Sequence, residues 1–278
     1  MLSTPYNYDN KKLEDMCRDL RLTVIDITTR AKSGHPSSCF SAVEIMAVLY
    51  FGGVMKYNPD DPWNLERDRF ILSKGHAAPL LYSILAKAGF FDEDLLKSLR
   101  EVGSPVQGHP IQGILPGIEA TTGSLGQGLS LGIGHSLAGR LNSLDYNIFV
   151  LLGDGECEEG QIWEAAMAAS HFNIDNLIAI VDYNKYQETG PISREMGLEP
   201  FAEKWKSFGW SVHEVNGHNI KEIKEKLNLC LNKKGSPSVM IAHTVKGKGV
   251  SFMEKDYTFH GRALTEEQAE VAKREILK

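Results

Sequence analysis

The sequence lacks features that mark several classes of protein. No basic run is longer than two residues and the net charge is -6, which argues against nucleic acid or an anionic membrane as the main partner. No segment approaches the length of a membrane span, and the first residues contain no apolar stretch of the kind a signal peptide carries. These absences lead us to expect a cytoplasmic protein.

Cysteine is scarce, and its spacing excludes the usual cysteine-rich zinc motifs. The chain has 4 cysteines, Cys17, Cys39, Cys157 and Cys230, and their scattered positions indicate reduced thiols. Cys157 lies in a polar loop, where we interpret it as a small packing residue rather than an oxidation-sensitive thiol. No G-x-G-x-x-G follows a first strand, which argues against a nicotinamide-binding domain.

What is present indicates an α/β fold. The chain has 278 residues, 42% of them hydrophobic and 24% charged, as in a globular domain with a large core. Apolar runs at residues 148–152 and 177–181 are typical of buried parallel strands, and residues 163–172 between them are typical of a crossover helix. We therefore predict a parallel sheet flanked by helices on both faces.

Polar residues follow both predicted strands. Gly153-Asp154-Gly155 ends the first strand, and Asn184 stands just after the second. Since ligands of open α/β sheets bind at the carboxyl ends of the strands, a carboxylate and an amide oxygen there suit a hard cation such as Mg²⁺. The flanking glycines allow backbone N–H groups to approach an anion. The alternative is that both are ordinary turn residues.

These residues carry a family resemblance. Asp154 with Asn184 resembles the thiamin diphosphate signature, and GDGECEEGQIWEA with DNLIAIVDYNK closely resembles the amino-terminal, diphosphate-binding part of transketolase. The resemblance implies that Asp154, Asn184 and the carbonyl of Tyr186 hold Mg²⁺, or Ca²⁺ or Mn²⁺, against the cofactor. It also implies that Gly155 donates a backbone hydrogen bond to the diphosphate.

The segment around His35 extends this resemblance. Apolar residues at alternating spacings of three and four predict a helix over residues 11–31, followed by a loop at His35-Pro36-Ser37-Ser38. Ser41 and Glu44 suggest a capping box that opens an apolar helix ending at Gly52-Gly53. SGHPSS resembles the transketolase segment whose histidine contacts substrate hydroxyls, although a lone loop histidine is usually structural.

A strand at residues 69–73 leads to Lys74 and His76, and then to an apolar helix. A strand, a glycine turn and a helix form an anion-binding geometry. The match of SKGHAAPLLY to transketolases implies that His76 meets the cofactor diphosphate. Lys74 either contacts the diphosphate together with His76 or is merely solvated.

Residues 103–128 form a long glycine-rich loop of the kind that tends to be functional. His109 resembles a second histidine for sugar hydroxyls, and Gly123, Ser124 and Leu125 resemble the loop that contacts the cofactor ring. The next predicted helix, residues 126–141, has many small residues, which suit either a subunit contact or tight packing within the domain.

Glu159 and Glu164 begin the crossover helix, where solvated glutamates suit the helix dipole. In transketolases the matching residues join a carboxylate network between two active sites. Toward the carboxyl end, a strand at residues 239–245 brings Lys246 to the sheet edge, while Lys248 is expected to be exposed. His260 matches a histidine that reaches both diphosphate and sugar, and residues 265–268 form a capping box.

The resemblance implies two sets of functional residues. The catalytic set is His35, His109, His260, Glu159 and Glu164. The set that binds cofactor is Ser38, Lys74, His76, Gly123, Ser124, Leu125, Asp154, Gly155, Glu156, Asn184, Lys246 and His260.

The resemblance spans nearly all of residues 1–278, which we expect to form one diphosphate-binding domain. Transketolases continue into a pyrimidine-binding and a carboxy-terminal domain, and the former supplies the glutamate that activates the cofactor. We find no candidate for that glutamate. We therefore expect the amino-terminal subunit of a split transketolase, working with a second chain in an α2β2 assembly on sugar phosphates.

Rival functions are a dihydroxyacetone synthase-like enzyme, an enzyme for a branched or sulfonated sugar, and a non-catalytic diphosphate-binding module.

Overall fold

A computed structural model describes residues 2–278 and is built on one parallel sheet of five strands. The strands are β1 (Arg69–Leu72), β2 (Ile148–Gly153), β3 (Leu177–Tyr183), β4 (Ser211–Asn216) and β5 (Ser238–His243). Their order across the sheet is β1-β2-β3-β5-β4, and all neighbouring strands run parallel. The predicted parallel sheet and its β-α-β unit are confirmed.

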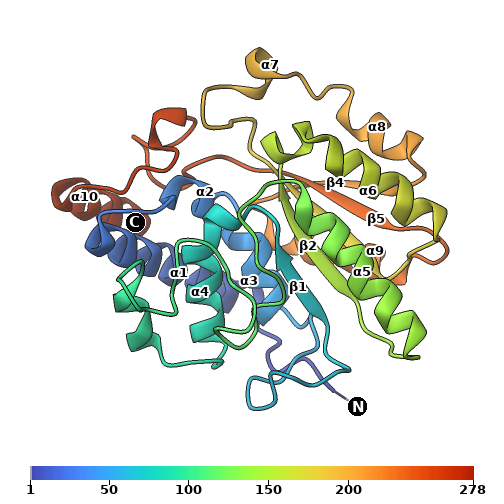
Figure 1. The fold of residues 1–278 in the computed structure, drawn as a ribbon. Helices are drawn as coiled ribbons and strands as arrows, with labels where there is room; N and C mark the ends of the chain where they lie inside the picture. Colours follow the sequence, from blue (N-terminus) through green and yellow to red (C-terminus); the bar gives the residue numbers. More distant parts are fainter. Residues whose placement is uncertain (1) are drawn as a thin grey trace.

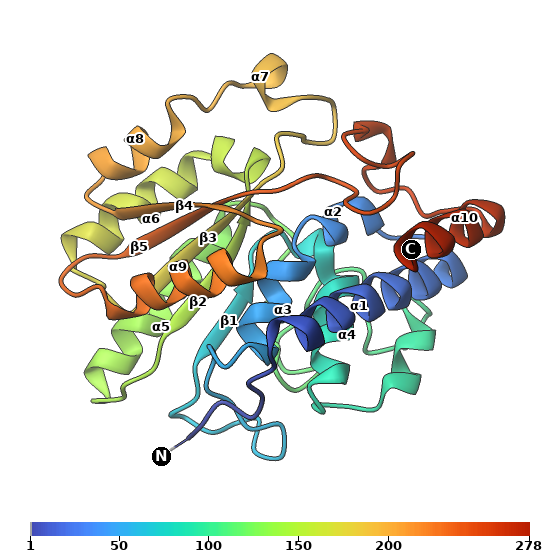
Figure 2. The ribbon, with the colours of Figure 1, turned by 180° about the vertical axis from the view of Figure 1, so that it is seen from behind.

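Helices cover both faces of the sheet, as predicted (Figures 1 and 2). One face carries α1 (Asn10–Ala31), α3 (Val43–Phe51), α4 (Ala78–Lys87) and α9 (Ile220–Asn232), with α10 (Glu266–Ile276) packed on α1. The other carries α5 (Gln127–Leu141), α6 (Gly160–His171) and α8 (Phe201–Ser207). Short elements complete the fold: α2 (Pro36–Phe40), α7 (Ile192–Glu195), and the 3-10 turns η1 (Gly75–Ala77), η2 (Glu93–Ser98), η3 (Gly155–Glu158) and η4 (Tyr257–Phe259).

The central strands supply both cores because their side chains alternate between the two faces. In β2, Phe149 and Leu151 join the core under α1, α3 and α4, whereas Ile148, Val150 and Leu152 join the core under α5 and α6. All five side chains are fully buried. Burial on both faces explains why the strand is a continuous apolar run rather than an alternating one.

The small residues of α5 allow close packing within this chain. A Cβ added to Gly128 would lie 2.3 Å from Ser73 Oγ, and one added to Gly132 would lie 2.8 Å from a methyl group of Val150. Both values are shorter than van der Waals contact. At these two positions, packing of the helix on the sheet accounts for the glycines.

Two local predictions near the first helices were wrong. Residues 36–40 form the helical turn α2 rather than a loop, because Pro36 suits the first turn and the N–H of Cys39 bonds the carbonyl of His35 at 3.1 Å. The predicted capping box is absent. Ala42 is the N-cap of α3, Ser41 donates to Asp182 instead, and Glu44 pairs with Arg21.

Side chains cap two other helices, one of them as predicted. The side chain of Asn219 caps α9 by accepting from the N–H of Glu222, and Thr265 with Gln268 forms the predicted capping box of α10. Among residues 2–278, no helix is both long and apolar enough to cross a membrane.

Candidate functional site

Four strands end at one cavity of about 380 Å³. Lys74 follows β1, Asp154 follows β2, Asn184 follows β3 and Lys246 lies beyond β5. Parallel strands place these ends at the same edge of the sheet, so residues far apart in sequence meet there. The predicted site residues that line the cavity are Ser38, Lys74, His76, Leu125, Asp154, Gly155, Glu156, Glu159, Asn184, Tyr186, Lys246 and His260.

The remaining predicted residues do not line this cavity. The ring of His35 packs against those of His76 and His260, which do, and Gly123 is half-buried, whereas His109, Ser124 and Glu164 are exposed. Two other cavities are larger. One of about 600 Å³ lies between α1 and α9, and one of about 980 Å³ lies beside residues 185–199 and shares Asn184 and Tyr186 with the candidate site. Neither is lined by Lys74, Asp154 or Lys246.

Asp154 is a buried carboxyl that lacks a cationic side-chain partner among the described residues. Burial, and then the charge of Asp182, raise the pKa of Asp154 to about 7. Its two oxygens accept from the backbone N–H groups of Gly155, at 2.9 Å, and of Lys185. A bound cation would favour the ionised form of this carboxyl.

Asn184 and Tyr186 complete an oxygen-rich corner of the cavity. The Asn184 side-chain oxygen accepts from the Tyr186 N–H at 3.1 Å, and the Asn184 amide nitrogen donates to Asp182 at 3.4 Å. Within residues 2–278 no three His, Cys, Asp or Glu side chains cluster as metal ligands. One carboxylate, one amide oxygen and one carbonyl nevertheless fit Mg²⁺, which takes few protein ligands and completes its shell with water and phosphate.

Asp182 is a residue that sequence reasoning missed. It is fully buried at the end of β3 and forms an ion pair with the buried ammonium of Lys74. Burial alone would raise the pKa of Asp182, but Lys74 and the hydroxyls of Ser41 and Thr244 lower it below its usual value. A charged residue inside an apolar strand was the available signal, because such a residue needs a buried partner.

Lys246 connects two walls of the cavity. Its ammonium donates to Ser38 Oγ at 2.9 Å and lies 3.1 Å from Nδ1 of His260. Burial, and then the charge of Lys74, lower the pKa of Lys246 to about 8. Two buried lysines in a small cavity repel each other, and a bound anion relieves that repulsion. Lys248, which was expected to be exposed, is partly exposed and does not line the cavity.

Three histidines form a cluster at this site. The ring centroids of His35, His76 and His260 lie 5.1, 5.2 and 5.3 Å apart. Burial, and then the charge of Arg100, lower the pKa of His35 to about 4, while burial and Lys246 lower that of His260 to about 3. All three rings are therefore neutral at neutral pH, since the pKa of His76 is also well below its ordinary value.

The long loop brings His109 and Leu125 toward the same region. Gly123 has a φ of 149°, and a Cβ there would lie 3.3 Å from Cδ2 of His109. A larger residue at this position is disfavoured by both the backbone and the contact. Leu125 reaches the cavity, whereas Ser124 is exposed.

Glu156 holds the loops around the cavity. Its carboxyl accepts from the Ser73 hydroxyl and from the N–H groups of Gly126 and Gly153, each of the latter at 2.9 Å. Glu159 is exposed at the cavity rim, and Glu164 lies farther along α6.

Cys157 packs against the strand it follows. It is fully buried, and its thiol donates to the Gly153 carbonyl at 3.3 Å. Burial raises the pKa of this thiol well above its usual value. The interpretation of Cys157 as a packing residue fits this geometry, and all four cysteines are unpaired.

Comparisons with known proteins point to one family. The family model described as transketolase, thiamine diphosphate binding domain, matches residues 13–276. One subunit of the apulose-4-phosphate transketolase of Phocaeicola vulgatus is 41% identical over 256 residues, covering 92% of this chain and 90% of that protein. The 6-deoxy-6-sulfo-D-fructose transketolase subunit SqwG of a Clostridium species is 41% identical over 266 residues, covering 96% of each.

Longer relatives match only in part. Human transketolase is 41% identical over 267 residues, covering 95% of this chain but 42% of that protein. The crystal structure of transketolase from Campylobacter jejuni superimposes with a TM-score of 0.91 at 32% identity, covering 97% of this chain and 43% of that one. The resemblance inferred from the Asp154 and Asn184 motif is confirmed: this chain belongs to the family of transketolase thiamine diphosphate binding domains.

Proposed function

We propose that this chain is the amino-terminal subunit of a two-chain transketolase, which transfers a two-carbon ketol unit from a ketose to an aldose. One observation carries the proposal. The chain matches at least 90% of the length of two proteins that are themselves named transketolase subunits. The cavity at the sheet edge supplies the matching chemistry, with two buried lysines beside an oxygen-rich corner.

Thiamin diphosphate, when bound, supplies the carbon nucleophile and the electron sink that such a reaction needs. In this proposal Asp154, Asn184 and the Tyr186 carbonyl would bind Mg²⁺. Lys246 and His76 would hold the diphosphate, and Lys74 lines the same cavity. Gly155 donates its backbone N–H, and Leu125 packs against the cofactor. Ser38 and Glu156 support this arrangement through their bonds to Lys246 and to the loop backbones.

His35, His109 and His260 are assigned to the sugar. His260 accepts from Lys246 at Nδ1, so its proton lies on Nε2, where it can donate to a hydroxyl. Nδ1 of His35 is buried without a partner among the described residues, which suits a group awaiting a ligand. His109 lies outside the cluster of three histidines, in the loop of residues 103–128. Together these rings orient hydroxyls and move protons.

A second chain completes the site in this proposal. The carboxylate that activates the cofactor ring belongs to the pyrimidine-binding domain in transketolases, and human transketolase extends well beyond the matched region. We assign Glu159 and Glu164 to the contact between active sites of an α2β2 assembly, since both are exposed on or beside α6. Four unpaired cysteines suit a reducing, cytoplasmic location.

The donor sugar is a separate question. Two relatives act, by name, on apulose 4-phosphate and on a sulfonated fructose, so a branched or sulfonated sugar is as well supported as an ordinary pentose phosphate. A substrate panel with the reconstituted pair of subunits separates these possibilities.

Calorimetry tests the proposal. Thiamin diphosphate is titrated, with and without MgCl₂, into the chain alone and into the chain mixed with its candidate partner. We expect saturable binding that requires Mg²⁺ and tightens with the partner, followed by ketol transfer. Binding without transfer under every pairing favours a non-catalytic module. Absence of binding in the presence of the partner contradicts the proposal.

A further inference from the structure

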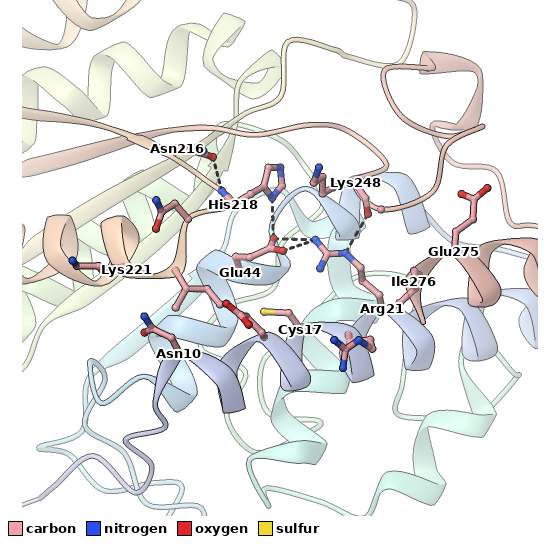
Figure 3. Close-up of a pocket in the computed structure, with 15 residues that line it drawn as sticks. Asn10, Cys17, Arg21, Glu44, Asn216, His218, Lys221, Lys248, Glu275 and Ile276 are labelled. Atoms are coloured by element: carbon pink, nitrogen blue, oxygen red, sulfur yellow. Dashed lines mark hydrogen bonds and ion pairs between the residues drawn. The ribbon is translucent and has the colours of Figure 1, made fainter. Parts of the chain in front are cut away.

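A largely buried charge cluster lines the groove of about 600 Å³ between α1 and α9, which shares no lining residue with the cofactor cavity (Figure 3). Arg21 of α1 donates through Nη2 to both oxygens of Glu44 in α3, at 2.8 and 2.9 Å. Nδ1 of His218, from the loop after β4, lies 3.0 Å from Oε2 of Glu44. Figure 3 shows Glu44 between the other two side chains.

The hydrogen bonds of His218 define its tautomer. The N–H of Val245 donates to Nε2 of His218 at 2.9 Å, so this nitrogen is an acceptor. The ring proton is therefore on Nδ1, which donates to Glu44. His218 thus connects the carboxylate to the backbone one residue before Lys246.

Arg21 connects the same carboxylate to two other backbone positions. It donates to the Phe40 carbonyl at 3.1 Å and to the Lys248 carbonyl at 3.2 Å. Phe40 ends α2, the helical turn that carries Ser38, and Lys248 lies two residues after Lys246. The outward bonds of the cluster therefore reach the two segments whose side chains meet in the cavity, where Lys246 donates to Ser38.

We propose that Arg21, Glu44 and His218 are positioning residues that hold Ser38 and Lys246 in register for the cofactor diphosphate. None of the three lines the cofactor cavity, so they act through the backbone. The inference rests on the proposed function, in which Lys246 meets the diphosphate.

The geometry favours this role over general stabilisation. A buried ion pair is not by itself a source of stability, because desolvation offsets its attraction. Here every side-chain hydrogen bond of Arg21 or His218 that leaves the cluster goes to a backbone carbonyl or N–H of the segments that carry Ser38 and Lys246. These targets couple the cluster to the backbone on which Ser38 and Lys246 stand.

His218→Leu and His218→Gln test the proposal, because a leucine removes both ring bonds whereas a glutamine amide offers a donor and an acceptor. The affinity for thiamin diphosphate is measured by calorimetry with Mg²⁺ and the second chain present. We expect about tenfold weaker binding for His218→Leu and substantial recovery for His218→Gln, as for one hydrogen bond to a charged group. His171→Leu, at an exposed histidine, is the control and keeps the wild-type affinity.

A double-mutant cycle with Ser38→Ala separates positioning from loss of stability. If His218 acts by holding Lys246 against Ser38, the losses in affinity are not additive, and His218→Leu adds less than about threefold to Ser38→Ala. Additive losses overturn the proposal. So does an unchanged affinity in His218→Leu, whether or not its melting temperature falls.

Two further measurements do not depend on the cofactor. Nitrogen-15 NMR of the free chain should show His218 protonated at Nδ1, and a crystal structure of His218→Leu should show Lys246 displaced from Ser38. If the wild-type chain fails to bind thiamin diphosphate, the proposed function fails. The positioning inference is tested separately by the crystal structure of His218→Leu. If Lys246 remains bonded to Ser38 in that structure, the positioning inference is overturned as well.

Discussion

The ammonium of Lys74 lies against the carboxylate of Asp182, joining the carboxyl ends of two strands that are not neighbours. β2 lies between β1 and β3, so this ion pair spans the strand that carries Asp154. Ser41 and Thr244 donate to the same carboxylate. The pair therefore links four segments of chain beneath the candidate cofactor site.

Removing one partner of this pair should be costly. Asp182→Ala leaves the Lys74 ammonium buried without a counter-ion, and we expect a loss of about 3 to 5 kcal/mol in the free energy of unfolding. Urea denaturation followed by circular dichroism measures this. Glu203→Ala, which breaks an exposed pair with Lys206, should leave the unfolding midpoint unchanged. Equal effects of the two variants would show that the buried pair is not structural.

Asp154 should control the metal dependence of cofactor binding. In the wild-type protein, a chelator should weaken binding of thiamin diphosphate at least tenfold, because the metal neutralises the diphosphate. Asp154→Asn should bind weakly and respond little to Mg²⁺, Mn²⁺ or Ca²⁺. Calorimetry across a metal series checks this, and full metal dependence in Asp154→Asn would exclude the carboxylate as a ligand.

Lys246 should make binding of the diphosphate fall at alkaline pH. The pKa of Lys246 in the free chain is lowered to about 8, whereas a bound diphosphate favours its charged form. Above pH 8 the free chain has lost this proton, so binding should take one up, and affinity should decline. Calorimetry at pH 8.5 in two buffers of different ionisation enthalpy measures the uptake.

The charged groups near Lys246 are Lys74, Asp154 and Asp182, and the neutral ring of His260 lies beside it. Lys246→Met is the matched control. This variant should bind more weakly at every pH and show no proton uptake near pH 8.5. Uptake that persists in Lys246→Met would assign the titration to another group.

The cysteines should be unreactive in the native chain. All four are buried, and burial raises the pKa of Cys39 and of Cys230 to about 12. Since the thiolate is the reactive form, an aromatic disulfide reagent should modify none of them at pH 8 and all four in denaturant. Fast native modification of Cys157 would contradict its role as a packing residue.

The local sequence pattern was sufficient to predict which residues stand at the ends of the strands. The apolar runs before Asp154 and Asn184 place these residues after neighbouring parallel strands, and the structure brings them to one cavity. Hydrophobic periodicity and turn residues involve only a few consecutive positions, so a single sequence reveals them.

The local pattern could not predict contacts between side chains that are far apart in the sequence. Ser41 and Glu44 have the spacing of a capping box, but Asp182 and Arg21 bind them instead. A buried charge competes successfully for a hydroxyl or a carboxylate, because leaving the charge unpaired costs more than losing a helix cap. His218 was missed for the same reason, since its partners come from α3 and from the segment after β5.

The parallel register of the sheet also has a consequence for the order of folding. The groups at the cavity come from positions as far apart as Ser38 and His260, and adjacent parallel strands cannot pair until the intervening chain has crossed over. Contacts of such long range form slowly and late. Affinity for the cofactor should consequently appear only in the final stage of refolding, so that binding reports completion of the whole sheet rather than of any segment.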